Sequence, residues 1–185
     1  MTDVGELARY LLFLFKEQME NVAEEEFDVT PMKLQKLLYY CQGYSLALTG
    51  RPMFDEEIEA WQYGPVVPSV YREYKKYGGG SIPLRVIGDE HDVDGADASI
   101  ARLVVREKGC MSGISLAVTT HGEAPWRDAY EGRYSNRVVS HESLKAFFDA
   151  ELQQTEMCDE DEDALWMSVG EPLSDMDWEE LLAKV

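Results

Sequence analysis

One short stretch of this 185-residue chain has the spacing of a catalytic motif. His121 and Glu123 share the H-x-E spacing of zinc deaminases, in which the His binds zinc and the Glu transfers protons. That chemistry also needs a P-C-x-x-C segment, and Cys158 stands alone further along the chain. The spacing therefore predicts a packed, hydrogen-bonded imidazole at a helix junction. A partner contact or a general acid or base role for His121 remains an alternative.

Other candidate chemistry is weaker. The acidic run 89–94 offers oxygen atoms and an imidazole that could bind a divalent cation, but it lacks the ligand order of an EF-hand and indicates a solvated loop. Three cysteines, Cys41, Cys110 and Cys158, show no C-x-x-C spacing, which favours a reducing cytoplasm over a disulfide framework or a zinc site. We predict no catalytic residue, no metal and no cofactor.

Aromatic residues form two groups that could bind a partner. Trp61 and Tyr63 fall on one face of a predicted strand, where they are either covered by a neighbouring helix or available to another protein. A second group interleaves aromatic and basic residues: Tyr71, Arg72, Tyr74, Lys75, Lys76 and Tyr77. It fits the edge of a core with lysine stems along it, a protein interface, or stacking on nucleic acid.

The charge of the chain bears on these alternatives. The formal net charge is −19, and residues 151–185 hold 12 Asp and Glu against one Lys. A chain this acidic is not attracted to phosphate backbones or anionic membranes, which excludes nucleic acid and membrane surfaces as partners and favours a basic protein. The apolar run 10–15 is too short to span a membrane and has no cleavage site behind it, so we expect a cytoplasmic protein.

Local signals place the first elements. Thr2 is the predicted N-cap of a helix that buries its apolar face up to about residue 19. Thr30 and Pro31 open a second helix that ends before Gly50. A strand is expected over 57–63, broken by Gly64 and Pro65, and a third helix begins at Pro68, carries Tyr71, Tyr74 and Tyr77 as neighbours and ends at 78–80.

Further helices follow an acidic loop. One runs through Ile100 and Val104 and ends near Gly109, and the next is capped by Ser112. A short turn starts at Pro125, and Ser140 caps the last core helix. The expected fold class is mainly α, an α+β arrangement with one small β-hairpin, in which a compact helical domain over 1–152 precedes an acidic C-terminal tail over 153–185.

The tail leaves three interpretations open. It is a solvated terminus, a segment that folds on a basic partner through Trp178 and Leu181, or a helix docked back on the domain.

Three words in fixed order carry a resemblance to a known family. They are Leu34-Gln-Lys-Leu-Leu-Tyr-Tyr40, Glu59-Ala-Trp-Gln-Tyr-Gly-Pro-Val66 and His121-x-x-x-Pro-Trp126. Over roughly 30–148 the chain resembles the SocA-like, DUF4065-type family, also called Panacea domains, found in bacterial and phage antitoxins. The resemblance implies an antitoxin that neutralises a toxin by direct binding or, for one branch, hands it to a protease. The tail lies outside the resemblance.

Together these observations predict a non-enzymatic antitoxin-like binding module for a protein toxin, basic and encoded nearby. The candidate partner-binding residues surround the corner at Gly64: Trp61, Tyr63, Gly64, Pro65, Val66, Tyr71, Tyr74, His121 and Trp126. Alternatives are an adaptor that delivers a client toxin to protease machinery, a phage-encoded or free-standing member without a toxin, and a small hydrolase centred on His121 and Glu123. The sequence carries no appended helix-turn-helix with a basic recognition helix.

Overall fold

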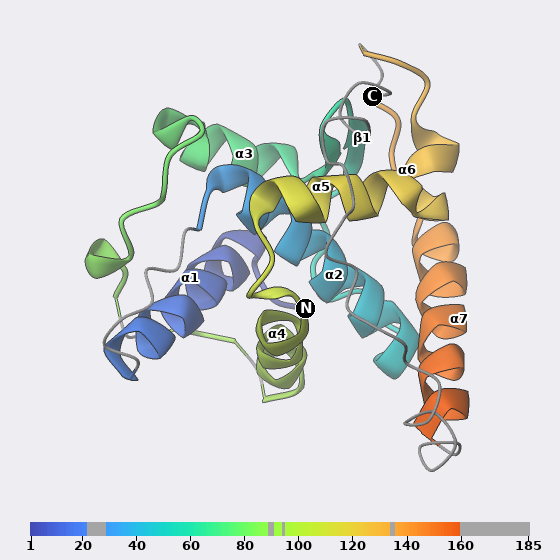
Figure 1. The fold of residues 1–185 in the computed structure, drawn as a ribbon, viewed down its shortest axis with the longest axis horizontal. Helices are drawn as coiled ribbons and strands as arrows, with labels where there is room; N and C mark the ends of the chain where they lie inside the picture. The colour runs from blue at the N-terminus through green and yellow to red at the C-terminus, as the bar shows by residue number, and fades with distance from the viewer. Residues whose placement is uncertain (22–28, 89–90, 94, 134–135, 160–185) are drawn as a thin grey trace, which may run out of the picture. The chain divides into compact units, whose positions relative to one another are not determined.

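A computed structural model describes residues 1–21, 29–88, 91–93, 95–133 and 136–159. Within this part of the chain it contains seven α-helices, two short 3₁₀ helices and one two-stranded antiparallel sheet, which confirms the predicted fold class (Figure 1). Among the described helices, none is long and apolar enough to cross a membrane. The chain divides into two compact units, 1–151 and 152–185. The acidic tail lies almost wholly outside the described residues.

Helix α2 (Pro31–Thr49) is the central element of the first unit. It packs against α1 (Val4–Asn21), α4 (Gly95–Lys108) and α5 (Gly113–Gly122), and nearly every residue up to Leu46 is buried (Figure 1). Its ends are those that the sequence predicts. Thr30 Oγ1 accepts a hydrogen bond from the backbone N–H of Lys33 at 3.2 Å, and Gly50 closes the helix with a left-handed φ of 71°.

The start of α1 corrects the predicted cap. Asp3 Oδ1, and not Thr2, accepts a hydrogen bond from the backbone N–H of Glu6 at 3.0 Å. The Thr2 hydroxyl donates instead to the buried Asp97 carboxylate at 2.7 Å, and the Thr2 backbone N–H donates to Met53 O at 2.8 Å. Thr2 therefore ties the N-terminus to α4 and to the segment that follows α2, an interaction 95 residues apart that no local pattern reveals.

The predicted strand over 57–63 is a shorter hairpin. Strands β1 (Glu59–Trp61) and β2 (Gly64–Val66) pair in antiparallel register, with Trp61 opposite Gly64. Gly64 and Pro65 therefore belong to the second strand and do not merely break the first. Gly64 adopts a φ of 97°, which favours glycine and allows the chain to reverse within two residues.

Helix α3 (Pro68–Tyr74) is also shorter than expected, because the chain tightens into the 3₁₀ helix η1 (Lys75–Tyr77) before Gly78. The predicted row of three tyrosines is therefore divided. Tyr74 is buried, Tyr71 is 37% exposed, and Tyr77 lies in η1. A second 3₁₀ helix, η2, spans Leu84–Val86.

The last helices follow their predicted caps. Ser112 Oγ accepts from the backbone N–H of Ser115 at 3.0 Å at the start of α5, and Ser140 Oγ accepts from that of Ser143 at 3.1 Å at the start of α7 (His141–Asp159). Between them, α6 (Ala124–Ala129) carries Pro125 in its first turn. The Phe148 ring of α7 closes the core against the tyrosines of α2.

Candidate functional site

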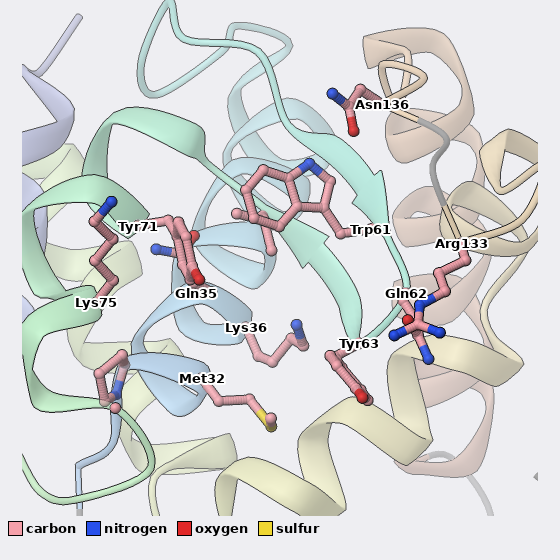
Figure 2. Close-up of a pocket in the computed structure, with 13 residues that line it drawn as sticks. Met32, Gln35, Lys36, Trp61, Gln62, Tyr63, Tyr71, Lys75, Arg133 and Asn136 are labelled. Atoms are coloured by element: carbon pink, nitrogen blue, oxygen red, sulfur yellow. The ribbon is translucent and has the colours of Figure 1, made fainter.

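The hairpin, the start of α2 and the α3–η1 segment enclose a pocket of about 680 Å³, all within the first unit. We call it the hairpin pocket (Figure 2). Its lining is Pro31, Met32, Gln35, Lys36, Trp61, Gln62, Tyr63, Val66, Tyr71, Lys75, Gly78, Arg133 and Asn136. Four of the predicted partner-binding residues, Trp61, Tyr63, Val66 and Tyr71, therefore meet around one cavity.

The aromatic residues of the pocket differ in exposure. Trp61 is half-buried and packs edge-on against Tyr71, with ring centroids 4.9 Å apart, while its indole N–H donates to Glu59 Oε2 at 2.6 Å. Tyr63, in the turn between the strands, is 63% exposed. The hairpin thus holds one ring in a fixed orientation and leaves another to solvent, an arrangement suited to contact with another protein.

Lys36 lies at the base of the hairpin pocket and is only 1% exposed. Its ammonium donates to Pro65 O at 3.1 Å, beneath strand β2 (Figure 2). A Cβ atom on Gly64 would stand 2.6 Å from Lys36 Cε, so the turn fits over the lysine only because residue 64 is glycine. Burial away from water lowers the pKa of Lys36 to about 7, because desolvation penalises the charged form.

Gln35 stands beside Lys36 on α2 and is 2% exposed. Its Oε1 accepts a hydrogen bond from the backbone N–H of Val67 at 2.7 Å, which fixes the orientation of the amide. Its Nε2 has no hydrogen-bond partner among the described residues. Neither polar residue was predicted as part of the site, although a signal existed. The apolar residues of α2 fall on every side of the helix, which indicates a helix buried all round.

His121 and Trp126 support the hairpin from behind and do not line the pocket. The His121 ring stacks on Trp126 at 4.1 Å, and the Trp126 indole donates to Trp61 O at 2.9 Å. Burial lowers the pKa of His121, and the charge of Lys36 lowers it further by a smaller amount. A hydrogen bond with the backbone of Gln62 raises it and partly offsets these effects. This is the packed imidazole at a helix junction that the sequence predicts.

Glu123 is buried and contacts α2. Tyr40 donates to Glu123 Oε1 at 2.7 Å, and burial raises the pKa of the carboxyl group above its ordinary value, partly offset by the Tyr39 and Tyr40 hydroxyls. Neither a hydrogen bond nor an ion pair joins His121 to Glu123 in the described part of the chain. The same residues contain no cluster of three or more His, Cys, Asp or Glu that could hold a metal ion.

Comparison with known proteins places this chain in a family. Residues 34–127, half of the chain, match the family described as "Antitoxin SocA-like, Panacea domain". The chain belongs to this family. The match contains most of the hairpin pocket, with Gln35, Lys36, the hairpin and Tyr71, and extends through Trp126. The lining residues outside it are Pro31, Met32, Arg133 and Asn136.

A curated relative agrees with the Panacea assignment. Antitoxin SocA of Caulobacter vibrioides (strain NA1000 / CB15N) is 38% identical over 60 residues, which is 32% of this chain and 32% of the relative. The match thus spans about a third of the relative's length. No solved structure matches the chain.

The remaining predicted contact residues of this Panacea domain have supporting positions. Gly64 and Pro65 are buried in β2. Tyr74, the last residue of α3, is also buried, and its ring centroid lies 6.4 Å from that of Tyr77. Their contact with a partner stays a prediction. Their positions in the structure show that they shape the hairpin and α3, whereas Tyr63 and Tyr71 present the accessible aromatic surface.

Proposed function

We propose that this chain is an antitoxin that neutralises a protein toxin by direct binding at the hairpin pocket. Its membership of the SocA-like Panacea family and its likeness to Antitoxin SocA support the antitoxin role. The observation that carries direct binding is the exposed Tyr63 beside a pocket lined by Trp61 and Tyr71. Tyrosine and tryptophan are the residues that anchor protein interfaces, because a large ring is buried at little conformational cost.

Electrostatics favours a basic toxin. Because the chain carries 36 acidic against 17 basic residues, a cationic partner is attracted over distances of about a Debye length, roughly 8 Å at physiological salt. This attraction speeds association more than it deepens the final affinity. The rate of binding should therefore fall as salt is added.

Neutralisation by binding needs no catalytic centre. His121 stacks on Trp126 and Glu123 bonds to Tyr40, so the two residues of the hydrolase alternative lie in different environments. Their arrangement favours a structural role for both, and we propose that the protein is not an enzyme. Replacement of His121 by Gln should accordingly leave neutralisation intact.

Co-expression with the toxic product of a neighbouring reading frame tests the function. We expect the wild-type chain to restore growth and to bind the purified toxin in calorimetry, and Tyr63→Ala to weaken binding by at least about 2 kcal/mol if the ring is a central anchor. Leu48→Ala is the matched control, since Leu48 is an apolar side chain, 51% exposed, at the far end of α2.

Three outcomes would change the conclusion. If the wild-type chain fails to restore growth, the antitoxin role is wrong. If Tyr63→Ala and Leu48→Ala bind equally well, the hairpin pocket is not the binding site. If rescue disappears in a host that lacks the unfoldase of its protease, the chain acts as a protease adaptor and binding alone does not neutralise the toxin.

A further inference from the structure

The charge of the hairpin pocket is opposite to that of the chain. The described residues that line it include three basic ones, Lys36, Lys75 and Arg133, and no Asp or Glu, whereas the chain has about twice as many acidic as basic residues. Figure 2 shows Lys75 and Arg133 on opposite sides with Lys36 between them. A cationic cavity in an acidic protein selects a group of negative charge.

Lys36 is the buried one of these cations, whereas Lys75 and Arg133 are exposed to water. An ammonium has three donors, and the described partner of this one is a neutral carbonyl, Pro65 O, at 3.1 Å. Burial lowers the pKa of this ammonium, and no carboxylate of the described residues offsets that shift. A buried ammonium without an anionic partner is destabilising, so a carboxylate that enters the pocket gains an unusually strong electrostatic interaction.

Gln35 adds a second unmet donor to the same cavity. Its Nε2 is buried and has no hydrogen-bond partner among the described residues, while Val67 N–H holds its Oε1 in place. A buried donor left unpaired is unfavourable, and a ligand oxygen that reaches it recovers that loss. The described lining of the pocket therefore offers two fixed donors and no carboxylate to accept from them.

We infer that the hairpin pocket receives an acidic side chain, Asp or Glu, from the protein partner. The carboxylate accepts a hydrogen bond from Lys36 Nζ, a further oxygen of the same segment accepts from Gln35 Nε2, and a neighbouring apolar side chain packs against Trp61 and Tyr71. This inference rests on the proposed function for the identity of the partner. A toxin that is attracted through its basic surface would be anchored by one acidic residue.

The shape of the pocket favours a side chain over a chain terminus. Lining residues continue past Lys36 in both directions, toward Lys75 on one side and toward Arg133 and Asn136 on the other (Figure 2). A peptide can therefore cross the pocket, direct one side chain down to Lys36 and leave on both sides, where the rim cations accommodate its backbone carbonyls.

Binding of short peptides tests the pocket without the toxin. The probe is acetyl-Phe-Glu-amide, the matched control is acetyl-Phe-Gln-amide, and the readout is the NMR resonance of the Trp61 indole N–H in the full chain. We expect saturable shifts with the Glu peptide, with a dissociation constant on the order of 1 mM for so small a ligand, and at least tenfold weaker binding of the Gln peptide. Equal binding of the two, or no saturable shift, overturns the inference.

A third peptide distinguishes the source of the carboxylate. Acetyl-Gln-Phe with a free C-terminus carries its charge on the terminus and none on a side chain. If it binds more tightly than the Glu peptide, the pocket recognises chain ends and the assignment to a side chain is wrong. Weaker binding supports the assignment.

Two variants connect the peptide result to the toxin. Lys36→Met removes the ammonium and keeps an apolar stem, and Lys33→Met is its control, because Lys33 is buried on the same helix but donates to Gly109 O, away from the pocket. With folding checked by circular dichroism, we expect Lys36→Met, and not Lys33→Met, to weaken the binding of both the Glu peptide and the toxin at least tenfold.

If Lys36→Met binds the toxin with unchanged affinity, the inference is overturned and the proposed function stands. A wild-type chain that binds the Glu peptide but no toxin overturns the proposed function alone.

Discussion

The Trp126 indole N–H donates a 2.9 Å hydrogen bond to the backbone carbonyl of Trp61, which joins α6 to the hairpin across 65 residues of sequence. Trp126 is itself held between His121 and Tyr130, at ring centroid distances of 4.1 and 4.6 Å. The orientation of the hairpin, and hence of Trp61 in the pocket, therefore depends on a residue that lies outside the pocket.

Trp126→Phe tests this dependence. The phenyl ring retains the stacking but lacks the donor, so the Trp61 carbonyl loses its partner, and we expect a loss of about 1–3 kcal/mol in the free energy of unfolding, measured with urea. Amide exchange in β1 and β2 should become faster. His121→Gln is the comparison, because it removes a ring that stacks on Trp126 but leaves the indole hydrogen bond in place, and so reports the contribution of stacking alone. A Trp126→Phe variant as stable as wild type would contradict the role given to this bond.

Gly64→Ala should disrupt the turn above Lys36. Residue 64 has a φ of 97°, and the added Cβ would lie 2.6 Å from Lys36 Cε and 2.7 Å from Nζ. The backbone strain and the steric clash of the Cβ with Lys36 both destabilise the turn. We therefore expect a loss above about 2 kcal/mol in unfolding free energy, together with loss of toxin binding.

Gly50→Ala separates the two contributions. Gly50 also has a positive φ, 71°, but its Cβ would meet nothing within 4 Å, so its replacement measures strain alone, about 1 kcal/mol. If the two variants lose the same stability, the close approach of Lys36 to the turn is not important.

Local patterns were sufficient to place four of the helix ends. Thr30, Gly50, Ser112 and Ser140 act through backbone groups within four residues, so each signal is complete in a short window of sequence. The cap at Thr2 was wrong for the opposite reason. Its hydroxyl meets Asp97, and the two come together only when α1 packs against α4.

The candidate site was predictable only in part, for a similar reason. The aromatic residues at 61, 63 and 71 stand close enough in sequence to suggest a cluster around one corner. The roles of Gln35 and Lys36 depend on β2, which covers α2 from about thirty residues further along the chain, as the hydrogen bond from Lys36 to Pro65 O shows. Tertiary packing, rather than local spacing, converts two polar residues of a buried helix into the base of a pocket.

Tyr40→Phe should destabilise the protein more at neutral pH than in acid. Tyr40 donates to the buried Glu123 carboxyl group, whose pKa burial has already raised. Loss of this donor raises the folded-state pKa further above the unfolded value, so stability is retained at low pH and lost as pH rises through the folded pKa. We expect a difference from wild type of about 1–3 kcal/mol at pH 7 that narrows toward pH 4, measured by urea unfolding.

Glu123→Gln supplies the control for this pH dependence. In that background no carboxyl group titrates at position 123, so the effect of Tyr40→Phe should be the same at pH 4 and pH 7. A difference that still grows with pH would assign the effect to another group.

Lys36→Met should stabilise the protein at neutral pH, and the gain should shrink as pH rises. Burial lowers the folded-state pKa of Lys36 to about 7 from 10.5, so between these values the unfolded chain binds a proton that the folded chain does not. Stability of the wild type therefore rises with pH in this window, by up to about 1.4 kcal/mol per pH unit, while the Met variant lacks this contribution. Urea unfolding at pH 6, 7.5 and 9 should show the largest excess in unfolding free energy of the Met variant over wild type at pH 6, despite the hydrogen bond to Pro65 O that it loses.

Lys33→Met is the control, because it reports the effect of methionine at a buried lysine of α2 outside the pocket. The alternative result is a stability difference between Lys36→Met and wild type that stays constant from pH 6 to pH 9. It would show that the Lys36 ammonium keeps its proton in the folded protein. The pocket would then already supply the stabilisation that we assign to a partner's carboxylate.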